Sequence, residues 1–297
     1  MRGFKKLVIL VLVMAMMAQT YIPTLGVQST FAKETDNQGP SVVKDGENKY
    51  VVNADGSLFT GVYNDYCYKD GVKYINSSLK SAKNISNYSK KKKTIKYFTL
   101  KVDGKTYAFN EKGKVYKKTI IGNYFFDETG IRCNDEVVKN AVRFVLNHGG
   151  KNNSRASKLK KCFNYLSSRK HYSHDTDHTA KLATTSGLPK AANKFLKKAN
   201  SGKGNCFGWA SAFAYIGKVL GYDVKVCKGT TRLVSGGYGP HGWTYIKYSG
   251  SYKVCDPNMN YKKNCWMKSY KSYPFSLGKS KTYFKLKIKN GKASWSK

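Results

Sequence analysis

Apolar and polar positions follow two different periods along this chain of 297 residues. Over residues 48–133, short runs rich in Tyr, Val and Phe alternate with turn dipeptides such as Asp103-Gly104. This pattern is typical of successive β-hairpins. Beyond it, apolar residues recur at helical spacing, first over residues 137–146. The change of period predicts an all-β hairpin module over residues 48–133 and a second domain over residues 134–297.

Two stretches of the hairpin module have similar sequences. They begin 17 residues apart, at Tyr107 and Tyr124, and share the pattern aromatic-x-Phe-Asn/Asp-Glu-x-Gly. This internal repeat resembles the cell-wall-binding or glucan-binding hairpin repeats of Gram-positive surface proteins, which present aromatic rings to sugars or choline. Those repeats usually contain tryptophan, whereas the four tryptophans of this chain lie at positions 209, 243, 266 and 295. A wall-binding module and an all-β spacer therefore both fit this segment.

The N-terminal stretch has the charge and hydropathy of an export signal. It contains no acid, carries basic residues at Arg2, Lys5 and Lys6, and continues into an apolar run over residues 7–18. This arrangement is typical of a secretory signal peptide, and the run is too short to span a bilayer. We expect a signal peptide over residues 1–32 and a polar linker over residues 33–47. The mature protein is then secreted, extracellular or cell-wall-associated in a Gram-positive-type bacterium, with no transmembrane anchor.

The charge balance constrains the partners more than the fold. The chain has 54 Lys and Arg residues against 17 Asp and Glu, a formal net charge of +37, and only six of the basic residues are arginine. Lysine ammonium groups act as point charges and suit diffuse attraction to polyanions. We expect anionic cell-wall polymers such as teichoic acids, or an acidic substrate, as partners. Nucleic acid is not expected, because the chain has no nucleic-acid-binding motif.

The candidate chemistry begins at Cys206. This residue follows a turn of small residues and precedes a run dense in Gly, Ala and Ser that ends near Gly221, so it is expected at the start of a buried helix. A helix N-terminus favours the thiolate, which is the nucleophilic form of cysteine. The chain has seven cysteines, an odd number, and we expect Cys206 to be a free thiol. The other six fit either disulfides or small buried thiols.

A predicted hairpin supplies a base and a carboxylate. His241 starts one strand and Asp256 follows the next strand, with the turn Ser249-Gly250 between them, so both side chains are expected at the same end of the sheet. His241 is the only histidine after Cys206, and Asp256 is the only acid after His241. A thiol, an imidazole and a carboxylate in this order suit nucleophilic catalysis.

These residues carry a family resemblance. The segments Gly204-Asn-Cys206-Phe-Gly-Trp, His241-Gly-Trp243 and Asp256-Pro257 resemble, in order and spacing, the transglutaminase-like core of bacterial extracytoplasmic proteins. The resemblance implies a papain-like α+β fold, with the cysteine on a central helix against an antiparallel sheet. It also implies that Cys206 is the nucleophile, His241 the general base and acid, and Asp256 the orienting carboxylate.

The same resemblance implies acyl transfer. Cys206 would attack a peptide, glutamine side-chain or isopeptide carbonyl and form a thioester, with its own backbone N–H as an oxyanion donor. Animal transglutaminases use a tryptophan upstream of the cysteine as the second donor, but no tryptophan precedes Cys206 here. Tyr172 is our candidate substitute, with Trp243 as a supporting residue. A thiol protease or amidase, and a non-catalytic wall-binding structural protein, are the alternatives.

We expect neither a metal nor a cofactor. His171, His174 and His178 would share one face of a helix, but their neighbours favour a polar loop at the rim of the cleft over a metal site. Residues 134–297 contain six acids, which are too dispersed for a calcium site.

Overall fold

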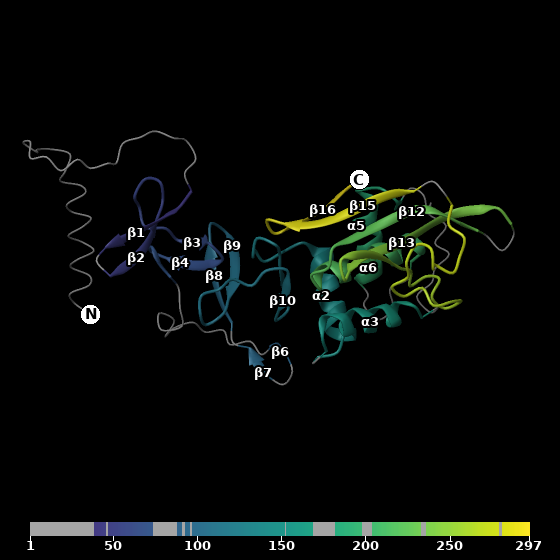
Figure 1. The fold of residues 1–297 in the computed structure, drawn as a ribbon, viewed down its shortest axis with the longest axis horizontal. Coiled ribbons are helices and arrows are strands. Elements are labelled where there is room, and N and C mark those ends of the chain that lie inside the picture. Colours follow the sequence, from purple (N-terminus) through teal and green to yellow (C-terminus); the bar gives the residue numbers. More distant parts are fainter. Residues whose placement is uncertain are drawn as a thin grey trace, which may run out of the picture. The chain divides into compact units, whose positions relative to one another are not determined.

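The computed structural model describes residues 39–45, 47–73, 88–90, 93–95, 97–151, 153–168, 182–197, 204–232, 236–278 and 281–297 (Figure 1). Apart from Gly39, all of them belong to one of the two units into which the chain divides. The expected signal peptide, Tyr172 and the three histidines from His171 to His178 lie outside the described residues. None of the described helices has the length and hydropathy needed to cross a membrane.

The first part of the chain consists of antiparallel hairpins, as the turn dipeptides predicted. Asp103 and Gly104 both have positive φ, 47° and 73°, the conformation that tight hairpin turns require. The strands are β1 (Ser41–Asp45), β2 (Asn48–Val52), β3 (Gly61–Tyr63), β4 (Tyr66–Lys69), β5 (Val72–Lys73), β6 (Tyr88–Lys90), β7 (Lys93–Ile95), β8 (Phe98–Val102), β9 (Lys105–Phe109), β10 (Thr119–Ile121) and β11 (Tyr124–Phe126).

The structure differs from the linker expected over residues 33–47. Strand β1 lies inside that range and pairs with β2 from Ser41 opposite Val52 to Asp45 opposite Asn48. The sequence has an Asp45-Gly46 dipeptide between these strands, the same turn signal that marks the later hairpins. The hairpins therefore begin at β1, although the polar composition of residues 33–47 suggested a linker there.

The second part of the chain has an α+β fold, which confirms the predicted class. Its helices are α2 (Glu136–His148), α3 (Arg155–Leu166), α5 (Gly187–Leu196) and α6 (Cys206–Val219). Its strands are β12 (Val224–Arg232), β13 (Tyr238–Tyr248), β14 (Ser251–Cys255), β15 (Thr282–Lys289) and β16 (Lys292–Ser296), which form one antiparallel sheet in the order β14-β13-β12-β15-β16.

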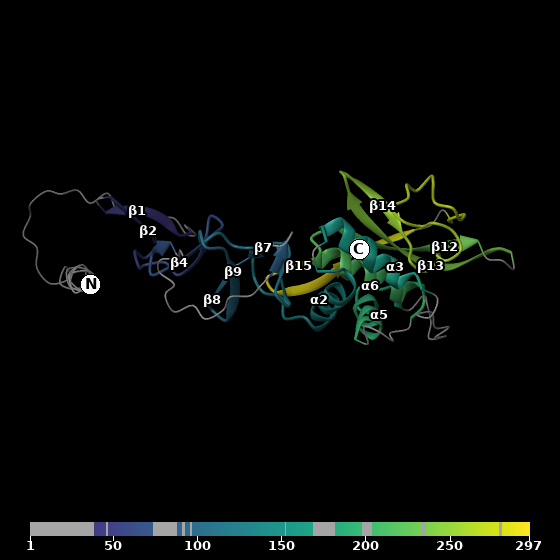
Figure 2. The ribbon, with the colours of Figure 1, turned by 90° about the horizontal axis from the view of Figure 1, so that it is seen from below.

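Helix α6 is the central helix of this fold and packs beside the sheet (Figures 1 and 2). Nearly every residue of α6 is buried, and small residues let the sheet approach closely. At Gly217, a Cβ atom would lie 2.8 Å from Cδ1 of Ile246 and 3.0 Å from Cγ1 of Val224. The Gly and Ala content of α6 therefore reflects close packing between helix and sheet.

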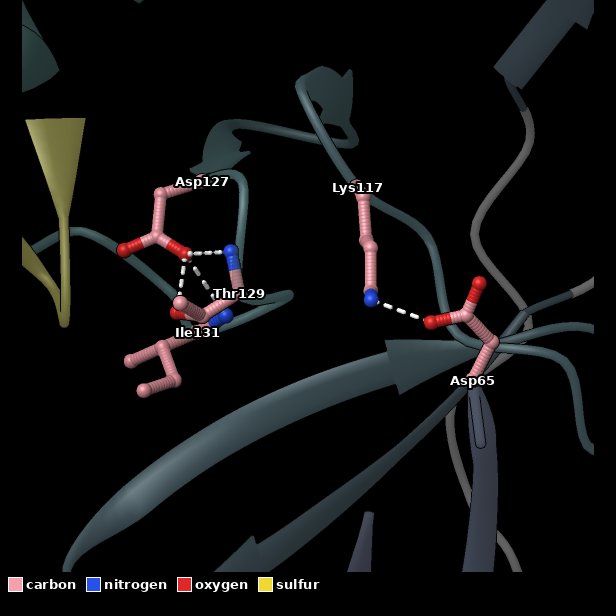
Figure 3. Close-up of polar contacts among 5 residues, drawn as sticks. All are labelled: Asp65, Lys117, Asp127, Thr129 and Ile131. Atoms are coloured by element: carbon pink, nitrogen blue, oxygen red, sulfur yellow. Dashed lines mark hydrogen bonds and ion pairs between the residues drawn. The ribbon is translucent and has the colours of Figure 1, made fainter. Parts of the chain in front are cut away.

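The hairpin of β10 and β11 packs into the same core as the helices. Ile120 and Phe125 belong to one buried apolar cluster with residues of α2 and α6. The buried carboxylate of Asp127 accepts hydrogen bonds from the N–H groups of Thr129 and Ile131, at 2.8 and 3.1 Å (Figure 3). Its other oxygen accepts the N–H of Gly291, between β15 and β16, at 2.7 Å.

These contacts cross the boundary expected at residue 133. The sequence repeat continues to Gly130 and suggests that the last hairpin belongs with the others. The packing also attaches that hairpin to the core of the second part, because Ile120 and Phe125 join the cluster of α2 and Asp127, directly after β11, is bonded to the loop after β15. Its other buried residues, Ile121 and Phe126, pack with the preceding hairpins. The folding unit around Cys206 therefore includes β10 and β11.

We predict that Phe125→Ala destabilises this unit. Truncating a buried phenylalanine costs about 3–5 kcal/mol, because apolar contacts are lost and a cavity remains. All four tryptophans lie after residue 205, so their fluorescence reports the unfolding of this part of the chain. Urea titration followed by tryptophan fluorescence should show a loss of about this size in the free energy of unfolding. Phe109→Ala is the matched control, since Phe109 is equally buried in a separate cluster of the hairpins, and it should leave the fluorescence transition in place.

Candidate active site

His241 and Asp256 meet at one end of the sheet, as the predicted hairpin requires. Strands β13 and β14 pair from Tyr248 opposite Ser251 to Thr244 opposite Cys255, so the residues beyond Thr244 and Cys255 lie at the same end. The Nε2 atom of His241 is 2.7 Å from Oδ2 of Asp256. Both side chains are almost completely buried, at 5% and 1% exposure.

Cys206 is the first residue of α6, where the sequence predicted it. The side chain of Asn205 caps the helix and accepts the N–H groups of Phe207 and Gly208, at 3.1 and 3.2 Å. As the first helical residue, Cys206 has a backbone N–H with no intrahelical acceptor. The structure therefore provides, on the same residue, a thiol and a helix-start amide that is not used within the helix.

The contact between α6 and β13 brings Cys206 to His241. A Cβ atom on Gly242 would lie 2.4 Å from Cδ1 of Phe207, so only glycine allows the strand to approach the first turn of the helix. One turn further along, the hydroxyl of Thr244 donates to the carbonyl of Ala210 at 2.8 Å.

The electrostatics of His241 reflect both neighbours. Burial of the ring opposes its positive charge, but the Asp256 carboxylate and a hydrogen bond with Cys206 outweigh burial and raise the pKa of His241 to about 10. The imidazolium form is therefore favoured at neutral pH. A protonated imidazole between a thiol and a carboxylate can donate a proton to a leaving group.

Asp256 has further hydrogen-bond donors that the sequence analysis missed. The phenol of Tyr273 donates to Oδ2 of Asp256, the oxygen that also faces His241, and the N–H of Met259 donates to Oδ1 at 3.1 Å. Burial and the nearby Asp256 charge raise the pKa of Tyr273, so its hydroxyl keeps its proton. Nothing in the neighbouring sequence separates Tyr273 from the other 22 tyrosines, because its role depends on how the chain after β14 folds back.

Trp243 packs beside the His241 ring. The two ring centroids are 5.9 Å apart, with an angle of 29° between the ring planes. On the neighbouring strand, a Cβ atom on Gly229 would lie 2.5 Å from Cη2 of Trp243. The indole is thus held between β12 and the imidazole, a position that restricts rotation of the His241 ring.

The other six cysteines have a different environment. All seven cysteines are free thiols in the structure, so the six form no bridges. Burial raises the pKa of each of these six thiols to about 12; they are Cys67, Cys133, Cys162, Cys227, Cys255 and Cys265. Among the residues described, no group of His, Cys, Asp and Glu side chains is arranged to hold a metal ion.

A helix-start cysteine beside a buried His-Asp pair defines the thiol-dependent class of active site. The comparisons with known proteins agree with this class: residues 144–267, which include Cys206, His241 and Asp256, match the family model of the transglutaminase-like superfamily. This match confirms the resemblance found in the sequence. It covers the part of the chain that carries the site and leaves the upstream hairpins unassigned.

One similar solved structure is described as a candidate cysteine protease from Cytophaga hutchinsonii. It is 13% identical to this chain, covers 55% of it and has a TM-score of 0.31. The chain spans 50% of the length of that protein. No significant match was found among curated proteins.

We predict that Tyr273→Phe slows the reaction of Cys206 with iodoacetamide about tenfold. Loss of one donor to a buried carboxylate costs about 1–3 kcal/mol and loosens the orientation of His241. The reaction rate is measured by mass spectrometry of the labelled protein. Tyr215→Phe is the control, because the Tyr215 hydroxyl is also buried and accepts a hydrogen bond from Trp295, away from the site. Equal losses in the two variants would show that Tyr273 acts only on general stability.

We also predict a pH dependence of stability that is specific to His241. Its pKa is raised from 6.5 to about 10 on folding, so its stabilising contribution is complete below about pH 6.5 and is lost as the pH rises towards 10. The difference in unfolding free energy between the native sequence and His241→Gln should therefore shrink between these limits. Urea titrations at several pH values measure it, and the subtraction cancels the titration of lysines. A difference that stays constant or grows with pH would contradict the assignment.

Proposed function

We propose that the protein is a secreted cysteine acyl-transfer enzyme that acts at the cell envelope. Its substrate carbonyl belongs to a peptide bond, a glutamine side chain or an isopeptide bond, and the intermediate is a thioester on Cys206. The single observation that carries this proposal is the arrangement of a helix-start thiol, a buried imidazole and a carboxylate within one domain.

The proposed reaction has two steps. In the first, the Cys206 thiolate attacks the carbonyl carbon, a C–S bond forms, and the imidazolium of His241 gives its proton to the departing amine or ammonia. In the second, His241 takes a proton from an incoming amine or water, which attacks the thioester; the C–S bond breaks, Cys206 leaves as the thiolate, and the starting thiolate–imidazolium pair is restored. Asp256 stays ionised and orients the imidazole throughout.

Oxyanion stabilisation is assigned to the backbone at the helix start. The N–H of Cys206 has no intrahelical acceptor and belongs to the positive end of α6, which suits a developing negative charge. Tyr172 remains the proposed second donor. Trp243 is proposed as a support for His241, since its ring stacks on the imidazole.

Two alternatives use the same chain differently. A thiol protease or amidase would resolve the thioester with water only, and the same three residues serve both reactions. A non-catalytic wall-binding protein would need none of them. Burial of the His-Asp pair contributes little to stability, because the cost of desolvating two charges offsets their attraction. A catalytic role gives a reason to keep the pair, so we favour an enzyme over a structural protein.

A peptide that contains glutamine tests the proposal. We predict that the mature protein incubated with the peptide and a primary amine produces the amine-substituted peptide and releases ammonia, as detected by mass spectrometry. Without the amine, water should resolve the thioester and yield the glutamate form. Cys206→Ala should abolish both products, because the C–S bond cannot form.

A second cysteine variant serves as the control. Cys67→Ala removes a buried thiol from the separate apolar cluster of the hairpins and should retain both products. Hydrolysis alone, even at high amine concentration, would favour the protease or amidase. Activity that survives in Cys206→Ala would reject the nucleophile.

A further inference from the structure

The C-terminal hairpin gives the sheet two chemically different faces. On β15, Phe284, Leu286 and Ile288 are buried in the main core. The residues that alternate with them, Tyr283, Lys285, Lys287 and Lys289, point to the opposite side and are exposed. Figure 1 shows β15 and β16 as the yellow strands beside β12. The lysines on that opposite side of the sheet form what we call the basic sheet face. They come from β12, β15 and β16 and are Lys225, Lys285, Lys287, Lys289 and Lys292.

Several of these lysines stand directly opposite one another. Lys225 on β12 pairs with Lys285 on β15, and Lys289 pairs with Lys292 on β16. Like charges at directly opposed positions destabilise a sheet. Between them, Lys287 is opposite Ser294, which offers no negative charge.

No acid neutralises this face in the part of the chain that the structure describes. The ion pairs found there join Lys117 to Asp65, Lys218 to Asp223 and His241 to Asp256. Asp223, which precedes β12, is thus already engaged by Lys218. Lys225 lies over the rings of Tyr252 and Tyr283, at 4.3 and 5.9 Å from their centroids. The other lysines of the row have no counter-charge among the described residues.

Protection of a sheet edge explains only part of the row. Lysines on edge strands prevent edge-to-edge aggregation, and this accounts for Lys292 on β16. Strand β15 pairs with β12 over residues 282–285 and with β16 over residues 285–289, so only Lys285 has strand partners on both sides. Edge protection does not account for Lys285, nor does it require a charge at every outward position from Lys285 to Lys289. The unbroken run of lysines suits an anionic partner.

We propose that the basic sheet face binds a linear polymer of phosphodiester-linked polyols. Alternate residues of a strand are about 6.7 Å apart, so β15 presents a regular row of point charges to an extended polyanion. Lysine suits such non-directional contacts with phosphodiester charges, whereas bidentate recognition of a phosphate or a base edge uses the planar guanidinium of arginine, which β15 and β16 lack. Sites for single-stranded nucleic acid also add a series of stacking rings, and along the row of β15 only Tyr283 is an exposed ring.

The position of this face is compatible with the enzyme. The lysines of β15 point away from the core that contains α6, and β12 separates β15 from β13, which carries His241. A bound polymer can therefore hold the protein at the envelope without covering Cys206. The role of this binding in holding an enzyme at the envelope rests on the proposed function, but polymer binding itself can be measured without any activity.

Two triple variants of equal charge test the proposal. The first replaces the lysines of β15, as Lys285→Gln, Lys287→Gln and Lys289→Gln. The control replaces exposed lysines on α2, α3 and α5, as Lys139→Gln, Lys161→Gln and Lys190→Gln. The probe is deacylated poly(glycerol phosphate), with affinity measured by calorimetry over a salt series.

We expect the β15 triple to weaken binding at least tenfold and the control less than twofold. The slope of log K against log salt should fall by about 2 in the β15 triple, at roughly 0.7 per lost phosphate contact on a single strand. Cys206→Ala should bind like the native sequence, so loss of catalysis and loss of binding are separate results. The melting temperature of the β15 triple should not fall, because the exchange removes repulsion between lysines. If it does fall, the single variant Lys287→Gln serves instead, since Lys287 is opposite Ser294, and it should still weaken binding about twofold.

Three results would overturn the proposal. Equal weakening by both triples would mean that net charge alone attracts the polymer. Unchanged binding in the β15 triple and in Lys287→Gln would remove this face from the interaction. Tighter binding of single-stranded DNA with the same number of phosphates would reject polyol phosphodiester as the partner.

Discussion

Between the first turn of α6 and strand β13 there is no room for a side chain at Gly242, because a Cβ atom would lie 2.4 Å from the Phe207 ring. This close approach determines the geometry of the site. It sets the distance between the helix that carries Cys206 and the strand that carries His241, and the Thr244 hydroxyl fixes it with a hydrogen bond to the carbonyl of Ala210. A larger residue at position 242 would move the thiol and the imidazole apart without replacing any polar group of the site.

The buried charge of Asp256 imposes the second constraint. A carboxylate at this depth needs donors on both oxygens, since an unsatisfied buried charge costs several kcal/mol. Met259, His241 and Tyr273 provide them, and the N–H of Asp256 donates to the carbonyl of Cys265. The chain after β14 is therefore part of the site, although it contributes no residue to the three-member arrangement.

The sequence predicted those features that depend on local chemistry. Asp-Gly dipeptides marked the hairpins, and the hairpin around Ser249-Gly250 brought His241 and Asp256 to one end of the sheet. Features that depend on distant packing were missed. Tyr273 resembles every other tyrosine until the chain after β14 folds back. The hairpin of β10 and β11 has the sequence of its predecessors, but it packs against the helical core as well as against the earlier hairpins.

The bond between Asp127 and Gly291 joins residues that are 164 positions apart. Strand β15 likewise reaches β12 across a long intervening segment. Contacts of such sequence separation are slow to form, because a large loop must close before they stabilise the chain. The core around α6 is complete only when β15 is present, because Phe284, Leu286 and Ile288 belong to it. During synthesis, which proceeds from the N-terminus, this core therefore stays incomplete until β15 has been made.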